Sequence, residues 1–330
     1  MTTPRPRPPH RVATTVTALV VPFGVLAATV LVVLAWAPRL PDPVATHWSG
    51  ADVPDGFGSL ASLLAVPLVF GGLLAVGMWA LAFWLGRDTS TRRIAAGFAS
   101  GTAAFLSATT LGTLHGQLDL ADAATAPGVG PTIGLAFGVA LVVGVVVALV
   151  VPRTPHQPTT APVDPAAPRA GLGATERAAW SSTVTSRAAL VGGGVAALTT
   201  AGLAIGLRTP AMLLVPVALL MLGAAMFVLR VSVDGRGLVA RSPLGWPTLR
   251  VPLDEVVAAR AVTVDPFGEF GGWGYRVGQD GRVGVVLRRG EAIEVERTGG
   301  RVNVVTVDDA ARAASLLNTL ADRSRSATAG

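Results

Sequence analysis

The sequence predicts an integral membrane protein, all-α with six transmembrane helices, followed by a small cytosolic β-roll with a C-terminal helix. Three observations predict this fold. The 330-residue chain is 51% hydrophobic and only 14% charged, whereas soluble domains carry about 25% charged residues. The apolar residues gather in uncharged runs of membrane-spanning length. Beyond residue 230 the pattern changes to short apolar stretches separated by turn residues.

The six uncharged runs are each long enough to cross a hydrocarbon core, which takes about 20 apolar residues. A backbone in lipid must satisfy its own hydrogen bonds, so we expect these runs to be helices. The first run is too long for a signal peptide and is kept as a span. Only Arg208 separates the last two runs, which predicts a tight helical hairpin. The runs are Val12–Ala37, Leu60–Leu85, Ile94–Leu114, Pro131–Val151, Ala188–Leu207 and Thr209–Leu229.

Arginine supplies every basic residue of the chain, and its distribution predicts the orientation. With the N-terminus inside, the external loops carry only Arg39 and Arg208. The cytosolic segments before the roll then carry Arg5, Arg7, Arg11, Arg87, Arg92, Arg93, Arg153, Arg169, Arg177 and Arg187. Basic residues collect on the cytosolic side of membrane proteins, so both termini are expected in the cytosol, at a bacterial plasma membrane. The net charge of +6 thus reflects sidedness, and the expected partner is the lipid bilayer rather than nucleic acid.

These patterns divide the chain into six segments. The first is a basic cytosolic tail (1–11), followed by a four-helix transmembrane region (12–151) that includes an external loop (38–59). Next come a Pro/Ala-rich cytosolic linker (152–187) and a transmembrane hairpin (188–229). The chain ends with the β-roll (230–322) and a disordered tail (323–330). Proline recurs nearly every third residue in the linker sequence "PRTPHQPTTAPVDPAAPRAGLG". That spacing favours an extended spacer with its backbone in water, and a docking motif for a partner is the alternative.

Turn residues punctuate the C-terminal region. Asp234-Gly235, Asp280-Gly281 and Gly299-Gly300 are typical of hairpin turns, because glycine supplies the positive φ that such turns need. Around the last turn, "AIEVERTGGRVNVVTV" alternates apolar with polar residues, which indicates a half-buried antiparallel pair. A helix capped near Asp308 is expected to close the roll of about seven strands. Its apolar stripe consists of Ala310, Ala313, Leu317 and Leu320.

Two short motifs lie in this region, "VPLDEV" (251–256) and "GGWGYR" (271–276). Here the chain resembles the bacterial pleckstrin-homology-like domains that are fused to membrane proteins. The resemblance implies a seven-stranded roll capped by a helix, with no enzymatic role. From Arg230 onward there are 14 arginines against 12 acids, without the cluster of basic residues that marks an anionic-lipid site. Trp246 and Trp273 are expected either to line a peptide groove or to pack in the core or rim of the roll.

The loop between the first two spans, "LPDPVATHWSGADVPDGFGS", has a distinctive spacing of proline, histidine and glycine. Its matching residues are Leu40-Pro41, Pro43, His47, Gly50 and Pro54-Asp55-Gly56. On these residues, the stretch from about 15 to 65 resembles the membrane family called domain of unknown function 1648. That unit also occurs in immunity proteins against a peptide toxin, but the later spans lack the rest of their pattern. The resemblance implies a topology and a loop, without a reaction.

Three interpretations of this loop are open. His47, Asp42, Asp52 and Asp55 offer the nitrogen and carboxylate ligands that zinc accepts, and His115 on the other external loop is the candidate histidine partner. The same aspartates are ordinary turn residues. In that structural interpretation Asp55 caps the second span and His47 bonds to its own backbone. The third interpretation is a recognition or sensing loop. Its candidate residues are Pro41, Pro43, His47, Trp48, Gly50 and Asp55.

The leading functional hypothesis is a non-enzymatic membrane protein engaged in sensing, immunity or envelope-associated scaffolding. A protein or peptide partner would bind the external loop or the cytosolic domain. The absence of cysteine excludes thiolate catalysis and disulfides, and the sequence indicates no cofactor. A transporter or pore is one alternative, although the six runs lack the Asp, Glu, Arg and His residues that coupled carriers usually place there. A metal-dependent membrane hydrolase that uses the His47 loop is the other.

Overall fold

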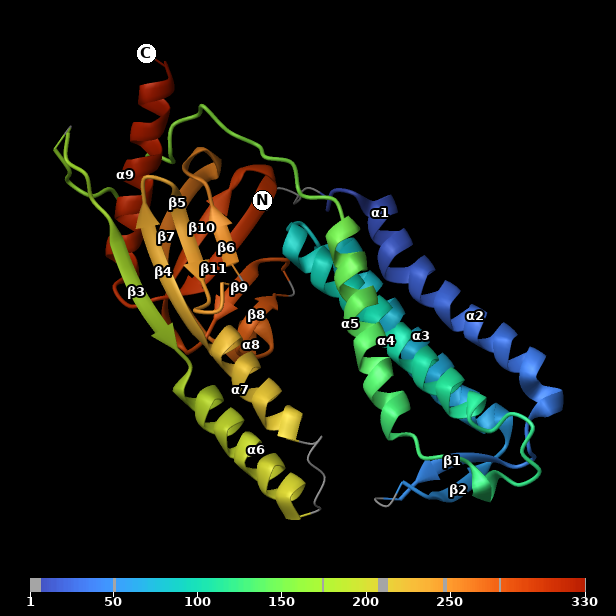
Figure 1. The fold of residues 1–330 in the computed structure, drawn as a ribbon. Coiled ribbons are helices and arrows are strands. Elements are labelled where there is room, and N and C mark those ends of the chain that lie inside the picture. The colour runs from blue at the N-terminus through green and yellow to red at the C-terminus, as the bar shows by residue number, and fades with distance from the viewer. Residues whose placement is uncertain are drawn as a thin grey trace. The chain divides into compact units, whose positions relative to one another are not determined.

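The computed structural model describes residues 7–49, 52–173, 175–206, 213–245, 248–278 and 280–329. The chain forms two compact units (Figure 1). Arg7–Thr154 is a helical bundle with a small β-hairpin, and the chain from Pro155 onward forms two β-sheets, a helical hairpin and a final helix. Within the described residues, five helices are long and apolar enough to cross a membrane: Arg11–Arg39, Leu60–Leu85, Thr89–His115, Gly130–Val150 and Arg187–Gly206. The chain therefore has the composition and helix lengths of a membrane protein.

The first span is one helical stretch with a change of winding near its start. It consists of α1 (Arg11–Thr15), the π-helical turn η1 (Val16–Val20), α2 (Val21–Trp36) and the 3-10 turn η2 (Ala37–Arg39). Pro22 lies at the beginning of α2. Its ring occupies the place of an N–H and crowds the carbonyl of the preceding turn, so a regular α-helical turn is disfavoured there. The wider π-helical turn accommodates this proline.

Helix α4 (Thr89–His115) is the centre of the bundle and contacts α2, α3 (Leu60–Leu85) and α5 (Gly130–Val150). Small residues allow this packing. A Cβ placed on Gly97 would lie 2.7 Å from the carbonyl oxygen of Gly144, and one on Gly144 would lie 2.9 Å from that of Gly97. Only glycine fits at both positions, and small residues at helix interfaces let backbones approach closely in membranes.

Arg92, in the first turns of α4, is fully buried although it is charged. Its guanidinium donates to the carbonyl oxygens of Gly86 (2.7 Å) and Pro152 (3.1 Å) and to Oγ1 of Thr154 (3.1 Å). It thereby binds the C-terminal end of α3 and the segment after α5 to the start of α4. The cationic side chain satisfies carbonyls at helix ends that have no partner within their own helices.

The second unit contains two sheets. One has the order β3-β4-β5-β6, with strands Trp180–Thr185, Val228–Asp234, Gly237–Arg241 and Thr248–Val251. The other has the order β7-β10-β11-β9-β8, with strands Val256–Val264, Gly290–Arg297, Arg301–Thr306, Val283–Val286 and Gly274–Val277. Short helical segments are η5 (Leu253–Glu255), α8 (Pro266–Phe270) and η6 (Thr298–Gly300), and α9 (Ala310–Ala329) follows β11. A β-rich region with a final helix is thus confirmed.

The predicted turns and pairings of this region are confirmed in position, although the positive φ of the first hairpin lies at Gly237 and not at Gly235. Asp234 pairs with Gly237 across the first hairpin, and Arg297 pairs with Arg301 around the Gly299-Gly300 turn. Strands β8 and β9 are antiparallel on either side of Gly281. The predicted stripe of α9 packs against the sheets: Ala310, Ala313 and Leu317 are fully buried and Leu320 is partly buried.

The sixth predicted span is not confirmed. The run Thr209–Leu229 contains α7 (Leu214–Phe227), an apolar helix of 14 residues, and β4 begins directly after it at Val228. The strand begins there because Val228 pairs with Thr185 of β3. Helix α6 (Arg187–Gly206) and α7 contact each other as the predicted hairpin. The predicted connection at Arg208 lies outside the described residues.

The linker 152–187 is predicted to be a solvated spacer, but parts of it pack on the second unit. Residues 180–185 form β3, whose six residues pair with β4. Upstream, Val163 and Ala167 are buried in the core of the second unit, and Asp164 forms an ion pair with Arg260 (2.6 Å). Apolar valine and alanine between the prolines supply surface to bury, and the strand edge of β4 supplies backbone partners. A proline spacing alone does not reveal either of these.

The tail predicted to be disordered, 323–330, is helical as far as Ala329, as the continuation of α9. Arg323 donates to the carbonyl oxygens of Leu172 (2.8 Å) and Gly173 (2.6 Å). Arg325 donates to the carbonyl oxygen of Val256. These bonds hold the last turns of the helix on the unit. The helix begins at Ala310, and the predicted cap Asp308 pairs with Arg288.

Candidate functional site

The predicted loop between the first two spans is a two-stranded antiparallel hairpin, β1 (Val44–Trp48) and β2 (Pro54–Gly58). It covers one end of the helical bundle together with residues 116–129, and we call these two segments the loop cap. Val44 packs against Val33, Leu64 and Leu114 of three helices. Ala45 packs against Ala123 and Ala126 of the second segment. The hairpin thus lies between the helix ends and the second segment.

A buried glutamine joins the two segments. Gln117 is fully buried, and its Oε1 accepts the N–H of Ala45 at 2.7 Å. Its Nε2 donates to the carbonyl oxygens of Ala45 (3.0 Å) and Thr113 (3.2 Å). The side-chain amide therefore replaces a neighbouring strand for Ala45. Without it, two buried backbone groups would lack partners, which is costly.

Asp52 and Trp48, which belong to the hairpin and the turn between its strands, hold the start of α5. Asp52 accepts the N–H of Val129 (2.8 Å) and of Gly130 (3.4 Å) through its carboxylate oxygens. A carboxylate at a helix N-terminus satisfies free N–H groups and complements the helix dipole. Trp48 donates from Nε1 to the carbonyl oxygen of Pro127 (3.1 Å). Glycine is required at position 128, between these two contacts, because a Cβ there would come 1.9 Å from Oδ2 of Asp52.

An exposed ion pair completes these contacts. Nε and Nη2 of Arg39 donate to the two carboxylate oxygens of Asp119, at 3.0 and 2.5 Å. The N–H of Asp119 also donates to the carbonyl oxygen of Arg39 (2.8 Å). Hydrogen bonding to the guanidinium lowers the pKa of Asp119. Both side chains are in solvent, so the pair contributes less to stability than the buried amide of Gln117.

His47 and Asp55 pair with each other across the hairpin. Nδ1 of His47 lies 2.5 Å from Oδ1 of Asp55, and the histidine side chain is 72% exposed. Gly56 faces His47, where a Cβ would come 2.8 Å from the Cβ of the histidine. The expected bond of His47 to its own backbone is thus replaced by a carboxylate partner. Asp55 is not the cap of the second span; Ser59 is, accepting the N–H of Ser62 at 3.2 Å.

The other histidine considered for a metal site lies in a different environment. His115 ends α4 and its ring contacts Trp36, with 5.9 Å between the ring centres. Across the described ranges, no group of three or more His, Cys, Asp and Glu side chains is placed to hold a metal ion. Asp52 is engaged at α5, and His47 pairs with Asp55.

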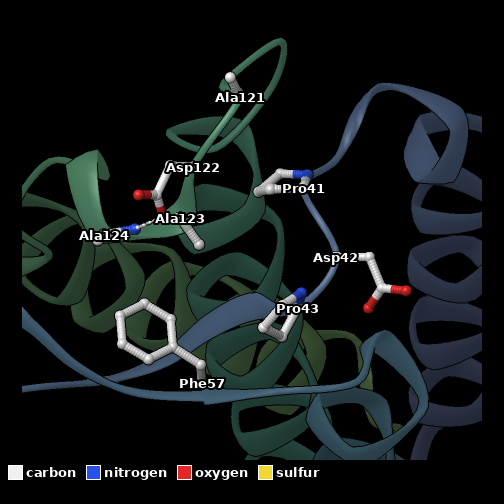
Figure 2. A pocket seen from close by; sticks show the side chains of 8 residues that line it. All are labelled: Pro41, Asp42, Pro43, Phe57, Ala121, Asp122, Ala123 and Ala124. Atoms are coloured by element: carbon white, nitrogen blue, oxygen red, sulfur yellow. Dashed lines mark hydrogen bonds between the residues drawn. The ribbon is translucent and has the colours of Figure 1, made fainter.

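The loop cap also contains a shallow open pocket of about 260 Å³. Figure 2 shows Phe57 of β2 on one side, the segment with Pro41 and Pro43 on another, and the turn at Ala121–Ala124 opposite. Asp122 closes that turn by accepting the N–H of Ala124 at 2.9 Å. Among the described residues the lining consists of Pro41, Asp42, Pro43, Phe57, Ala121, Asp122, Ala123 and Ala124. It is mainly apolar, with two carboxylates.

The structure thus separates the predicted site residues into two groups. Pro41 and Pro43 line the pocket, whereas His47, Trp48 and Asp55 lie on the hairpin without lining it. Gly50 lies outside the described residues, as does Trp246, one of the two tryptophans considered for a groove. The other, Trp273, contacts Phe267. Sequence reasoning missed Gln117 and Phe57, because a single glutamine after a span and a phenylalanine between glycines carry no local signal of their partners.

Comparison with known families gives a match in the region of the hairpin. Residues 24–71 match the model of the family described as Domain of unknown function (DUF1648). The match covers the first span from Gly24, the hairpin and the beginning of α3. No curated protein and no solved structure gives a significant match to the chain. The family match therefore covers the hairpin of the loop cap and the adjoining parts of α2 and α3, and it does not include residues 116–129.

Proposed function

We propose that this chain is a non-enzymatic membrane protein whose loop cap binds a peptide or protein segment. The observation that carries the proposal is that one set of residues holds the cap together while another set lines an open pocket. The buried amide of Gln117, the half-buried indole of Trp48 and the exposed carboxylate of Asp52 are used to hold the cap together. The open pocket beside them has an apolar lining of proline, phenylalanine and alanine. A rigid scaffold with an accessible apolar pocket is suited to binding rather than to proton transfer or metal chemistry.

The size and lining of the pocket indicate the kind of occupant. Its volume of about 260 Å³ is slightly below the range of roughly 300–1,000 Å³ typical for small-molecule sites. One or two apolar side chains of a peptide would fill it. Prolines and an aromatic ring form the type of surface on which extended peptides dock. The carboxylates of Asp42 and Asp122 at its edge favour a segment with basic residues next to its apolar ones.

The distribution of arginine supports an arrangement with the cap outside the cell and both termini in the cytosol, at a bacterial plasma membrane. The second unit, with its two small sheets and C-terminal helix, would then be a cytosolic pleckstrin-homology-like domain. Together, an external binding surface and a cytosolic domain on one chain suit a role in sensing or in envelope-associated scaffolding, with the lipid bilayer as solvent. No nucleic-acid partner is proposed.

Site-specific photocrosslinking in the native cell tests this function. A photoreactive phenylalanine analogue replaces Phe57, which is exposed and lines the pocket. A matched control carries the analogue at Val53, which is exposed on the same hairpin but does not line the pocket. We expect a discrete peptide or protein adduct at position 57 that is weak or absent at position 53. Adducts only with lipid, or the same adducts at both positions, would contradict the proposal.

A further inference from the structure

The second unit has an end that is fixed to the helical hairpin. Strand β3 ends at Thr185 and α6 begins at Arg187, while α7 ends at Phe227 and β4 begins at Val228. The N–H of Ser186 donates to the carbonyl oxygen of Phe227 (3.0 Å). The helices therefore continue from paired strands with almost no intervening chain. If the hairpin lies in a membrane, this end of the sheet lies at the membrane surface.

Strand pairing identifies which turns share that end. Arg230 near the start of β4 pairs with Arg241 at the end of β5, so the turn after β5 lies at the hairpin end. This turn carries Leu244, whose side chain is 49% exposed. The opposite end of the same two strands carries Arg236, in the turn between them. Seven residues of β4 separate the two ends by roughly 20 Å.

A second apolar feature lies at the same end. Helix α8 and strand β8 lie next to the end of α7 (Figure 1), and α7 contacts β8. A Cβ placed on Gly274 would come 4.0 Å from the ring of Phe227. Phe267 of α8 is 60% exposed, and its ring meets that of Trp273 edge to face at 5.0 Å. The exposed ring of Phe267 and the half-buried ring of Trp273 thus lie near Phe227, the last residue of α7.

We name these residues, with three arginines near them, the membrane-proximal rim: Leu244, Phe267, Trp273, Arg230, Arg241 and Arg276. The three arginines are exposed, and in the part of the chain that the structure describes none of them forms an ion pair with an acid. Arg276 folds back so that its Nε donates to the carbonyl oxygen of Trp273 (2.8 Å). Apolar side chains and arginines without an acid partner among the described residues therefore lie at the same end of the unit.

We propose that the membrane-proximal rim docks on the interface of the same bilayer that holds the hairpin. Leu244, Phe267 and Trp273 would enter the interfacial layer, and the arginines would bind lipid phosphates. Aromatic side chains are favoured at that depth, and arginine keeps its charged head in the polar layer while its stem contacts apolar groups. Guanidinium groups also bind phosphate with paired hydrogen bonds.

The tether explains why a nearly neutral domain can use so small a surface. The hairpin holds the rim within reach of the bilayer, so docking is intramolecular and needs little affinity of its own. Several arginines elsewhere on the unit are matched by acids, as Arg282 is by Glu269, Asp280 and Glu294. The near balance of charge over the whole domain is therefore compatible with a basic rim. This inference rests on the hairpin being in the membrane and is independent of the function proposed for the loop cap.

Depth measurements on the full chain in lipid nanodiscs test the proposal. The chain has no cysteine, so single substitutions Phe267→Cys, Leu244→Cys and Arg236→Cys can each carry one polarity-sensitive fluorophore. We expect labels at 267 and 244 to emit at shorter wavelength and to be quenched by lipids with a spin label near the headgroup. The label at 236, at the opposite end of the same strands, should remain aqueous and unquenched. Two rim positions guard against one variant that fails to fold.

Varying the charge of the lipids provides a second test of the proposal. Replacing Arg230, Arg241 and Arg276 by glutamine should reduce the quenching at 267 in nanodiscs that contain anionic lipid, with a smaller change in purely zwitterionic ones. Labels at 267 and 244 that are as aqueous as the label at 236 would overturn the proposal. Shielding that is found in native membrane vesicles but not in pure lipid would assign the rim to a protein partner and would overturn it as well.

Discussion

The side chain of Gln117 is hydrogen-bonded to both backbone groups of Ala45, 72 residues earlier in the chain. This contact connects the hairpin to the end of α4 in a place where both residues are fully buried. The side-chain amide bonds to the backbone of β1 as a neighbouring third strand would. It thereby fixes the distance between the two segments of the loop cap.

Gln117→Leu should loosen the cap, because it leaves the buried N–H and C=O of Ala45 without partners. An unsatisfied buried group costs about 1–3 kcal/mol. We expect faster hydrogen exchange at the amides of β1 and β2 in detergent-solubilised protein, with the exchange of α4 little changed. Asp119→Asn is the matched control from the same segment, and its exposed ion pair should matter little. Equal protection of the hairpin in Gln117→Leu and wild type would contradict this role.

His47→Ala should leave the protein inserted in the membrane at near-normal abundance. The helices insert through their apolar length, and His47 is an exposed residue whose bond to Asp55 is worth about 1 kcal/mol. Quantitative immunoblotting of membrane fractions measures the abundance. Elemental analysis of the purified proteins measures the metal, and we expect no stoichiometric zinc in either protein. Zinc that is present in the wild type and lost with His47 would instead support the metal-site interpretation.

Gly97→Val should destabilise the helical bundle, because the new Cβ would collide with the carbonyl oxygen of Gly144. Forcing extra atoms into a packed interface typically costs about 1–3 kcal/mol. The control is Gly138→Val in α5, where a Cβ meets nothing within 4 Å. Thermal melting followed by size-exclusion chromatography in detergent should rank Gly97→Val well below wild type and Gly138→Val near it. If the two variants melt alike, close packing of α4 and α5 is not a determinant of stability.

The buried carboxylate of Glu255 should make the second unit sensitive to acid. Burial alone would raise its pKa, but the bond from the N–H of Gln157 and the pairing with Arg297 and Arg301 outweigh burial and lower the pKa from 4.5 to about 2. Because the folded-state pKa is depressed, the stabilisation is fully present above pH 4.5 and is lost as the pH falls toward 2. Melting curves of wild type between pH 7 and pH 2.5 should show this loss.

Glu255→Gln tests the same group at neutral pH. The variant leaves two buried arginines without their counter-charge, which costs about 3–5 kcal/mol, and it should show a smaller further loss on acidification. Glu296→Gln is the control, since its pair with Arg260 is partly in solvent and should contribute less than the buried pairs of Glu255. Acid profiles of Glu255→Gln and wild type that run parallel would assign the acid sensitivity to other carboxylates.

Local properties of the sequence determined several parts of this structure. The long apolar runs specify membrane-spanning helices because a backbone in lipid must bond to itself. Glycine specifies the turns at Gly281 and Gly299-Gly300, where it adopts the positive φ that few other residues allow, and in the first hairpin it does so at Gly237. The stripe from Ala310 to Leu320 specifies the buried face of α9 because its period is helical. The proline, histidine and glycine spacing specifies the loop that matches the DUF1648 family.

Only the tertiary structure decided which polar side chains meet. Gln117 with Ala45, Asp52 with Val129, and Glu255 with Arg297 lie far apart in sequence, and no periodicity or turn signal connects the partners. The same holds for residues 155–185, which pack on the second unit although their proline spacing favours an extended chain. Helices and turns follow from the conformations and burial of neighbouring residues. The pairing of polar groups depends on which segments folding brings together. Where these segments meet, a buried polar group without a partner is costly, so contacts that supply a partner are favoured.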